Sequence, residues 1–172
     1  MTDHEWDDCE FLRAYLITLR TFGTWLHGDE RGSIDRHGKN IYGTLRIAEN
    51  PKLHYQMQRD QRAPQFLLDS RQRTCVEASV RSCCRTRGYE LPAINVRTNH
   101  LHAVISAAVE PEAIINALKS NATRELREQK LVGSGMSVWS RGGSRRYLWK
   151  RHHVDAAIEY VLFGQGGDPP PF

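Results

Sequence analysis

Residues 99–105 constrain the fold most, because their side chains divide between the two faces of a β-strand. The segment is short, rich in apolar residues and preceded by turn-prone residues. Successive side chains of a strand point to opposite faces, so His100 and His102 share one face and Leu101 and Ala103 share the other. One face can therefore pack against a core while the other presents two imidazoles side by side.

The two histidines are candidate metal ligands. Two neutral imidazoles on a rigid strand form half of a site for a divalent metal ion. A His-x-His pair is common in sequences, however, and alone it has no specific meaning. Support for a metal site has to come from the rest of the chain.

The periodicity of apolar residues predicts four strands and three helices. The first helix follows Asp69 and Ser70, either of which can cap it, and it places Val76 and Val80 on one face. Gly88 is a natural stop, and Pro111 suits the first turn of the second helix. The expected elements are a strand within 11–21, a helix over 70–87, strands over 89–96 and 99–105, a helix that starts at 111 and is ended by Gly133, a strand within 138–149, and a helix over 154–163 capped near His153 or Asp155.

This order of elements predicts an α+β fold. The pattern βαββαβ is the ferredoxin-like arrangement, a four-stranded antiparallel sheet with helices on one face, here with an extra C-terminal helix. The open face would carry the two histidines. We expect a flexible arm over 1–10, one domain over 11–167 with a long loop insertion over about 24–65, and a disordered tail over 168–172.

Composition excludes several classes of protein. The 172 residues, 40% of them hydrophobic and 26% charged, are typical of one soluble globular domain. No apolar run is long enough to span a membrane, and the acidic, polar start is unlike a signal peptide. The four cysteines lack a zinc-type spacing, and adjacent Cys83 and Cys84 indicate thiols rather than a disulfide. We therefore expect a cytoplasmic protein with no membrane partner.

The net charge of +4 is unevenly distributed, because basic residues, Lys119 among them, gather in the second half of the chain. A basic stripe suits a phosphate backbone, although an ordinary solvated surface is an equal alternative. Three aromatic residues in the same region, Trp139, Tyr147 and Trp149, could stack unpaired bases or belong to the core. The candidate DNA-binding residues are Arg124, Arg141, Arg145, Arg146, Lys150 and Arg151.

A set of ordered motifs resembles one known family. His100-Leu101-His102 matches the histidine–hydrophobic–histidine (HUH) signature, and Tyr160 lies on the expected last helix. Together they resemble the single-tyrosine HUH transposases, the group of insertion-sequence and REP-associated tyrosine transposases. The further stretches that resemble the family are residues 99–105, 122–126, 139–143 (Trp-Ser-Arg-Gly-Gly) and 158–162.

The resemblance implies a metal-dependent endonuclease and strand transferase that acts on single-stranded DNA, often beside a hairpin. Tyr160 would be the nucleophile and would form a 5′-phosphotyrosine, while His100 and His102 would hold Mg²⁺ or Mn²⁺. Members of the family can work as homodimers. A non-cleaving DNA- or RNA-binding module on the same fold and a nickase of the replication-initiator or relaxase type are the alternatives.

The third metal ligand departs from the family pattern. The family commonly has Gln or Asn four residues after the tyrosine, but here that position is Gly164 and a glutamine follows as Gln165. Five residues turn an ideal helix by about 140° relative to Tyr160, so Gly164 would have to unwind the helix end. We expect Gln165 to be the ligand, with Glu159 and His153 as competitors.

Overall fold

Four antiparallel strands form a single sheet in the computed structural model, which describes residues 13–24, 51–52, 55 and 64–164. The strand order is β2-β3-β1-β4, as the ferredoxin-like arrangement requires, so the predicted fold class is confirmed. The predicted arm over 1–10, the tail over 168–172 and most of the predicted insertion lie outside the described residues. The elements are β1 (Ala14–Arg20), α2 (Ser70–Arg87), β2 (Glu90–Val96), β3 (His100–Ser106), α3 (Pro111–Glu128), β4 (Ser144–Leu148) and α4 (Arg151–Phe163).

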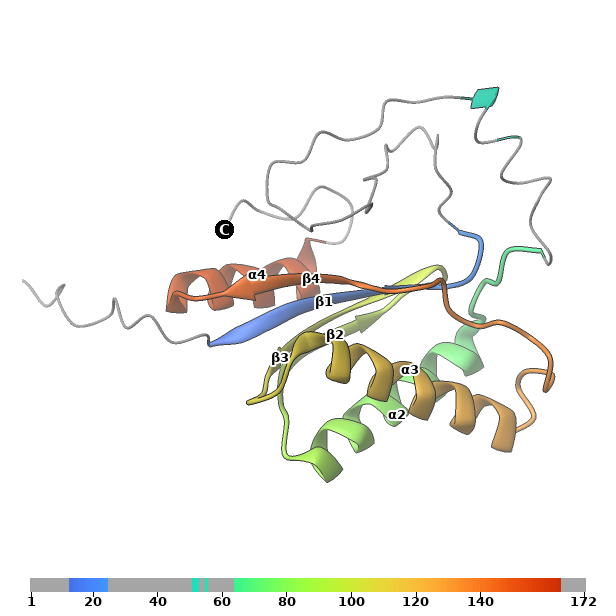
Figure 1. The fold of residues 1–172 in the computed structure, drawn as a ribbon, viewed down its shortest axis with the longest axis horizontal. Helices are drawn as coiled ribbons and strands as arrows, with labels where there is room; N and C mark the ends of the chain where they lie inside the picture. Colours follow the sequence, from blue (N-terminus) through green and yellow to red (C-terminus); the bar gives the residue numbers. More distant parts are fainter. Residues whose placement is uncertain (1–12, 25–50, 53–54, 56–63, 165–172) are drawn as a thin grey trace, which may run out of the picture.

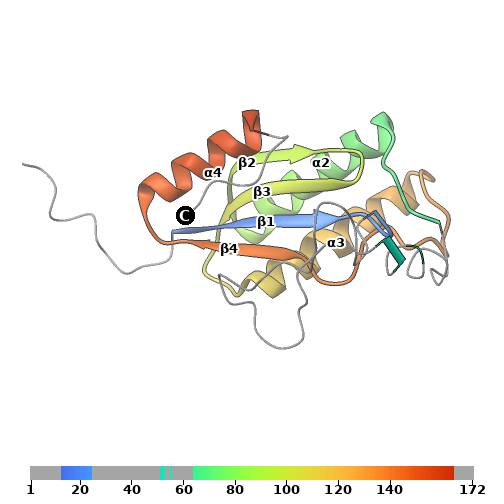
Figure 2. The ribbon, with the colours of Figure 1, turned by 90° about the horizontal axis from the view of Figure 1, so that it is seen from above.

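The helices lie on both faces of the sheet. Helices α2 and α3 pack side by side on one face, and α4 lies across the other (Figure 1). Seen from above, α4 starts at the end of β4 and crosses the sheet towards β2 (Figure 2). The face predicted to be open is therefore partly covered by the additional C-terminal helix.

Local sequence explains the bounds of α2. The Asp69 carboxylate accepts a hydrogen bond from the Gln72 backbone N–H at 2.8 Å, and the Gln72 side chain accepts one from the Asp69 N–H at 2.9 Å. This capping box satisfies two backbone donors at the start of the helix. Gly88 ends the helix with φ 69°, a conformation that glycine adopts without strain. The predicted range of 70–87 is confirmed.

Two predicted helix ends are wrong. Helix α4 begins at Arg151, three residues before the predicted start, and its N-cap is Lys150 rather than His153 or Asp155. The Lys150 carbonyl accepts backbone hydrogen bonds from His153 and Val154 at 3.1 and 3.2 Å, so the first turn forms without a side-chain cap. Helix α3 stops at Glu128 rather than near Gly133, because the following Lys130 turns the chain with φ 55°.

Strand alternation separates two cores. The face under α2 and α3 holds the larger one, in which Leu101, Ile105 and Leu118 are fully buried. The face under α4 holds a smaller one, composed of Ala14, Leu16, Ala93, Val104, Leu148, Ala157 and Val161. Cys75, Cys83 and Cys84 are buried and free, as expected for the adjacent pair. Within the described part of the chain, no helix has the length and apolar character needed to cross a membrane.

Candidate functional site

The two histidines of β3 lie together on the face that carries α4. Their rings meet edge to face with centroids 4.7 Å apart, as the strand alternation predicts. His100 is half-buried, whereas only 8% of His102 is exposed. The pair lies beyond the small core under α4, so the site begins where the apolar contacts of that helix end.

Neighbouring side chains orient both rings. The Nδ1 atom of His100 lies 2.7 Å from Oδ1 of Asn99, and because a carbonyl oxygen can only accept, Nδ1 carries the proton. Nε2 of His100 therefore keeps its lone pair. The Nδ1 atom of His102 lies 2.7 Å from the hydroxyl of Thr18, which is its cross-strand neighbour on β1. Such partners on the second nitrogen fix a ring for metal binding.

The surroundings of His102 keep its imidazole neutral. Burial, and to a lesser extent the nearby charges of His100 and Arg20, lowers the pKa of His102 to about 3. Arg20 lies directly opposite His100 in the pairing of β1 with β3. A neutral imidazole is the form that binds metal ions, so the environment suits the role that the sequence predicts.

Tyr160 of α4 faces the same histidine. Its hydroxyl oxygen lies 3.5 Å from Nε2 of His102, and the two ring centroids are 5.4 Å apart. Gly164 allows the tyrosine to lie this way, because a Cβ at that position would be 3.0 Å from Cδ2 of Tyr160. The structure thus brings together Tyr160, His100 and His102, three of the residues that the sequence singled out.

Asn95 of β2 ties α4 to the sheet beside the histidines. It is the cross-strand neighbour of His102, and its Nδ2 donates a hydrogen bond to the carbonyl of Val161 at 3.0 Å. The last carbonyls of a helix lack partners within the helix, so this bond satisfies one of them. The turn of α4 that carries Tyr160 is fixed in place by a side chain that the sequence analysis did not select.

The donor set fits half of a metal site. Nε2 of His100, and Nε2 of His102 in the tautomer whose Nδ1 donates to Thr18, would leave positions for oxygen ligands, which suits Mn²⁺ and, less well, Mg²⁺. In the described ranges, no three His, Cys, Asp or Glu side chains are grouped closely enough to bind an ion. Glu159 and His153 therefore do not complete the site in this structure, and Gln165 lies outside the described residues.

The six predicted DNA-binding cations do not form one cluster. Arg146 lies opposite Leu16 and so shares the face of the histidines, whereas Arg145 lies opposite Ile17 and pairs with Glu112 at 2.6 Å on the other face. Arg141 is exposed in the turn before β4. Lys150 and Arg151 are exposed at the start of α4.

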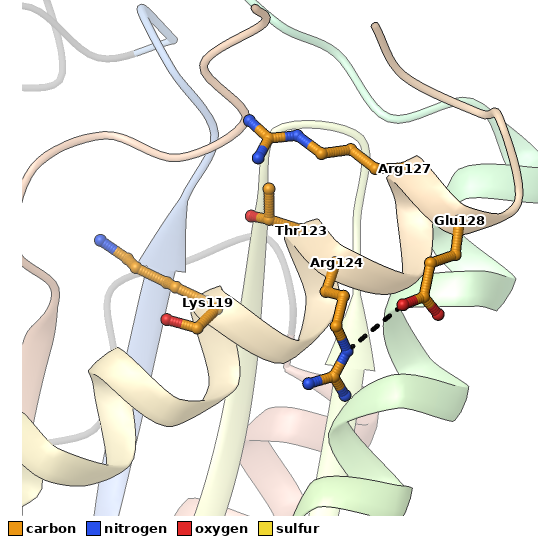
Figure 3. A pocket seen from close by; sticks show the side chains of 6 residues that line it. Lys119, Thr123, Arg124, Arg127 and Glu128 are labelled. Atoms are coloured by element: carbon orange, nitrogen blue, oxygen red, sulfur yellow. Dashed lines mark ion pairs between the residues drawn. The ribbon is translucent and has the colours of Figure 1, made fainter. Parts of the chain in front are cut away.

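Arg124 lies on α3, on the far side of the sheet from the histidines. It lines a surface hollow of about 470 Å³ together with Thr123 and Arg127 (Figure 3). Its guanidinium lies 3.9 Å from the Glu125 carboxylate and 3.8 Å from that of Glu128. The hollow contains none of the three grouped site residues, so it is not the site itself.

The aromatic residues after α3 behave differently from one another. Trp139 packs against the larger core, which is one of the two alternatives that the sequence leaves open. Tyr147 and Trp149 stack with centroids 6.0 Å apart and are both exposed. Base stacking by these two stays a prediction.

Sequence reasoning missed Thr18, Arg20 and Asn95, and it did not link Gly164 to the position of the Tyr160 ring. The first three alternate with core residues along their strands, so their side chains lie on the polar face once the strand order is known. Pairing the predicted first strand with the histidine strand would have found Thr18 and Arg20, and pairing the 89–96 strand with it would have found Asn95. The sequence shows Gly164 at the family's third-ligand position and at a helix end, and its contact with Tyr160 gives a reason for glycine there.

One family model covers the three grouped residues of the site. The model of a family described as IS200-like transposases matches residues 49–160, which include both histidines and end at the tyrosine. A solved REP-associated tyrosine transposase bound to a REP hairpin is similar over 96% of this chain and 75% of its own, with 13% identity and a TM-score of 0.47. A proposed transposase from Deinococcus radiodurans R1 is similar over 98% and 100%, with 13% identity and a TM-score of 0.45. No curated protein matches the chain.

Proposed function

Because the chain belongs to the IS200-like transposase family, we propose that it is a metal-dependent endonuclease and strand transferase for single-stranded DNA, with Tyr160 as the nucleophile. One observation carries the proposal. The Tyr160 hydroxyl lies 3.5 Å from Nε2 of His102, on the polar face of the sheet, where a phosphate and a metal ion can meet it. A protein that only bound DNA would need neither this tyrosine nor the oriented histidine pair.

The proposed reaction exchanges one ester bond for another. The phenolic oxygen of Tyr160 attacks the phosphorus atom and gives up its proton to solvent. The bond from phosphorus to the 3′ oxygen breaks, and that oxygen leaves with the electron pair and takes up a proton. The products are a 5′-phosphotyrosine and a free 3′-OH, and because the ester bond is kept, attack by a 3′-OH rejoins the strand.

His100 and His102 would hold the metal ion, with Gln165 as the proposed third ligand. A bound Mg²⁺ or Mn²⁺ would polarise a phosphate oxygen and stabilise the charge that develops at phosphorus. A phenol with a pKa near 10 is a weak nucleophile at neutral pH, so this help is needed. The hydrogen bonds of the two imidazoles with Asn99 and Thr18 hold the rings in place for it.

The proposed substrate is single-stranded DNA with an adjacent hairpin. Arg146 shares the face of the site and could bind a phosphate there. The other predicted cations do not form one phosphate-binding cluster, so each would contact DNA at a different place on the surface. A homodimer is a further proposal that follows from the family resemblance, and a cytoplasmic location is one that follows from the composition and the cysteines.

A nicking assay tests the proposed nucleophile. Labelled single-stranded DNA from the flanks of the gene is incubated with protein and Mn²⁺ and separated on denaturing gels. We expect Tyr160→Phe to abolish cleavage and to bind DNA as the wild type does. Tyr147→Phe is the matched control, since it removes another hydroxyl without touching the site. A Tyr160→Phe protein that nicks at the wild-type rate would exclude Tyr160 as the nucleophile.

Titration with Mn²⁺ tests the ligand set. We expect His102→Ala to lose more metal affinity than Gln165→Ala, because the imidazole is fixed by the sheet. Calorimetry measures both affinities directly. Equal Mn²⁺ affinity in Gln165→Ala and the wild type would remove Gln165 from the set.

A further inference from the structure

A short turn carries Arg141 to the end of the sheet where the histidines lie. This arginine turn, residues 140–143, joins the segment after α3 to β4. The Ser140 N–H donates a hydrogen bond to the Arg20 carbonyl at 2.9 Å, and Arg20 lies opposite His100 on the next strand. Neighbouring strands are about 4.8 Å apart, so the backbones of Ser140 and His100 are separated by about 10 Å.

The sheet and the core fix both ends of the arginine turn. At its start, the Ser140 hydroxyl donates a hydrogen bond to the Thr21 carbonyl at 2.8 Å. At its end, a Cβ on Gly143 would lie 3.0 Å from Cδ2 of Leu19 and 3.1 Å from Cδ1 of Ile115, so a larger residue would press on both core side chains. Between them, Gly142 has φ 69°, which glycine adopts readily.

Lys119 of α3 closes the turn from below. Its ammonium donates a hydrogen bond to the Ser140 carbonyl at 2.6 Å and another to the Gly142 carbonyl. These carbonyls flank Arg141 on either side. The side chain of Lys119 extends towards β1, while Arg124 of the same helix points away from it (Figure 3). The lysine thus uses two of its three N–H donors on the backbone of one turn.

The two hydrogen bonds from Lys119, called the clamp below, restrict a turn that its glycines would otherwise leave mobile. Two successive glycines give a chain many backbone conformations, and a guanidinium carried by a mobile turn loses entropy when it binds. A turn that is already fixed avoids this loss. Arg141 is exposed, and a guanidinium can bind a phosphate through two parallel hydrogen bonds.

We propose that Lys119 is a positioning residue, whose ammonium holds the arginine turn so that Arg141 can bind a phosphate of the DNA strand beside the histidines. The proposal rests on the proposed function. It gives Lys119 a different role from the one that the sequence indicates, which is that of a cation in a DNA-binding stripe. Lys119 acts on DNA only through Arg141, and it makes no phosphate contact of its own.

Limited trypsin digestion tests the clamp without DNA. Lys119→Met keeps the length of the side chain and removes the donors, and Arg127→Met is a matched control on the same helix. We expect cleavage after Arg141 to be several-fold faster in Lys119→Met, while cleavage after Arg124 stays at the wild-type rate. Arg127→Met should leave cleavage after Arg141 unchanged. Unchanged cleavage in Lys119→Met, or an equal increase at both sites, would overturn the clamp.

A double-mutant cycle tests the link to DNA. Binding of single-stranded DNA from the gene's flanks is measured at several salt concentrations in the Tyr160→Phe background. We expect Lys119→Met and Arg141→Ala each to lower affinity, and the double variant to bind no worse than the weaker single variant. A plot of the logarithm of the binding constant against the logarithm of the salt concentration should have a slope smaller in magnitude by about 0.7 in each of the three variants, which is the value for one phosphate contact on a single strand.

The possible failures are distinct. Additive losses, with a slope that falls by about 1.4 in the double variant, would show that Lys119 binds a phosphate itself and would overturn the proposal. A Lys119→Met protein that binds as the wild type does would overturn it as well. A wild type that binds no single-stranded DNA would instead contradict the proposed function, and the role of Arg141 with it.

Discussion

The two faces of the sheet are built for different purposes. On the face under α2 and α3, large aliphatic side chains such as Ile17, Leu101 and Leu118 are fully buried in a continuous core. On the face under α4, the core is small, and it gives way to Thr18 and His102, which are polar and yet almost fully buried. One set of strands thus separates what stabilises the fold from what carries the site.

This difference shows how a small domain can hold a polar site in place. Buried polar groups reduce stability unless they are hydrogen-bonded, and His102 is held by Thr18 on one strand and lies beside Asn95 on another. The apolar face provides the stability that such a site requires. Changes on the two faces should therefore have separable effects.

The largest expected effect is that of His102→Ala on cleavage. Removing a ligand from a site that stabilises charge at phosphorus should lower the cleavage rate at least about 100-fold. The thermal midpoint should change less than in a core variant, because the α2 and α3 face is untouched. Single-turnover cleavage in Mn²⁺, with melting followed by circular dichroism, measures both. Wild-type cleavage would show that the histidine face is not the site.

Leu118→Ala should have the opposite profile. Leu118 lies on α3 with its side chain fully buried, and such truncations lower the free energy of unfolding by about 2–5 kcal/mol. The cleavage rate per folded molecule should stay near that of the wild type at low temperature. Urea denaturation measures the free energy of unfolding, and single-turnover cleavage measures the rate. A large loss of cleavage in fully folded protein would break the separation of the two faces.

Sequence patterns predict the apolar face well and the polar face only in part. The helical spacing of Val76 and Val80 in α2 and the alternation in β3 suffice to find the core, because burial depends on local periodicity. His100, His102 and Tyr160 are visible as motif residues. Arg20 and Asn95 are not, because their places depend on which strands pair and in what register. Lys119 carries a surface charge in the sequence, but its contacts belong to the tertiary structure.

A smaller effect is expected for Thr18→Val, which keeps the shape and removes the hydroxyl beside Nδ1 of His102. Loss of a partner that orients a ligand typically lowers metal affinity about 10- to 100-fold. Calorimetry with Mn²⁺ measures it, and Ser144→Ala, on the strand paired with Thr18, is the control. Unchanged affinity would mean that the Thr18 hydroxyl does not orient the ring for metal binding.

The smallest expected effect is that of Asn95→Ala. It removes the hydrogen bond to the Val161 carbonyl, which should lower the free energy of unfolding by about 1 kcal/mol and the cleavage rate about tenfold. Asn121→Ala is the matched control, because the Asn121 amide also donates to a backbone carbonyl, that of Ala117 at 2.8 Å, but on α3. Equal effects of the two substitutions on cleavage would exclude a positioning role for Asn95.

Covalent capture tests the central claim most directly. Wild-type protein and Tyr160→Phe are incubated with Mn²⁺ and 5′- or 3′-labelled single-stranded DNA from the gene's flanks, and the products are denatured in detergent. The account predicts a protein–DNA adduct in the wild type only, which keeps the label at the 3′ end and is mapped to Tyr160 by mass spectrometry. Cleavage without an adduct, or an adduct on another residue, would contradict it.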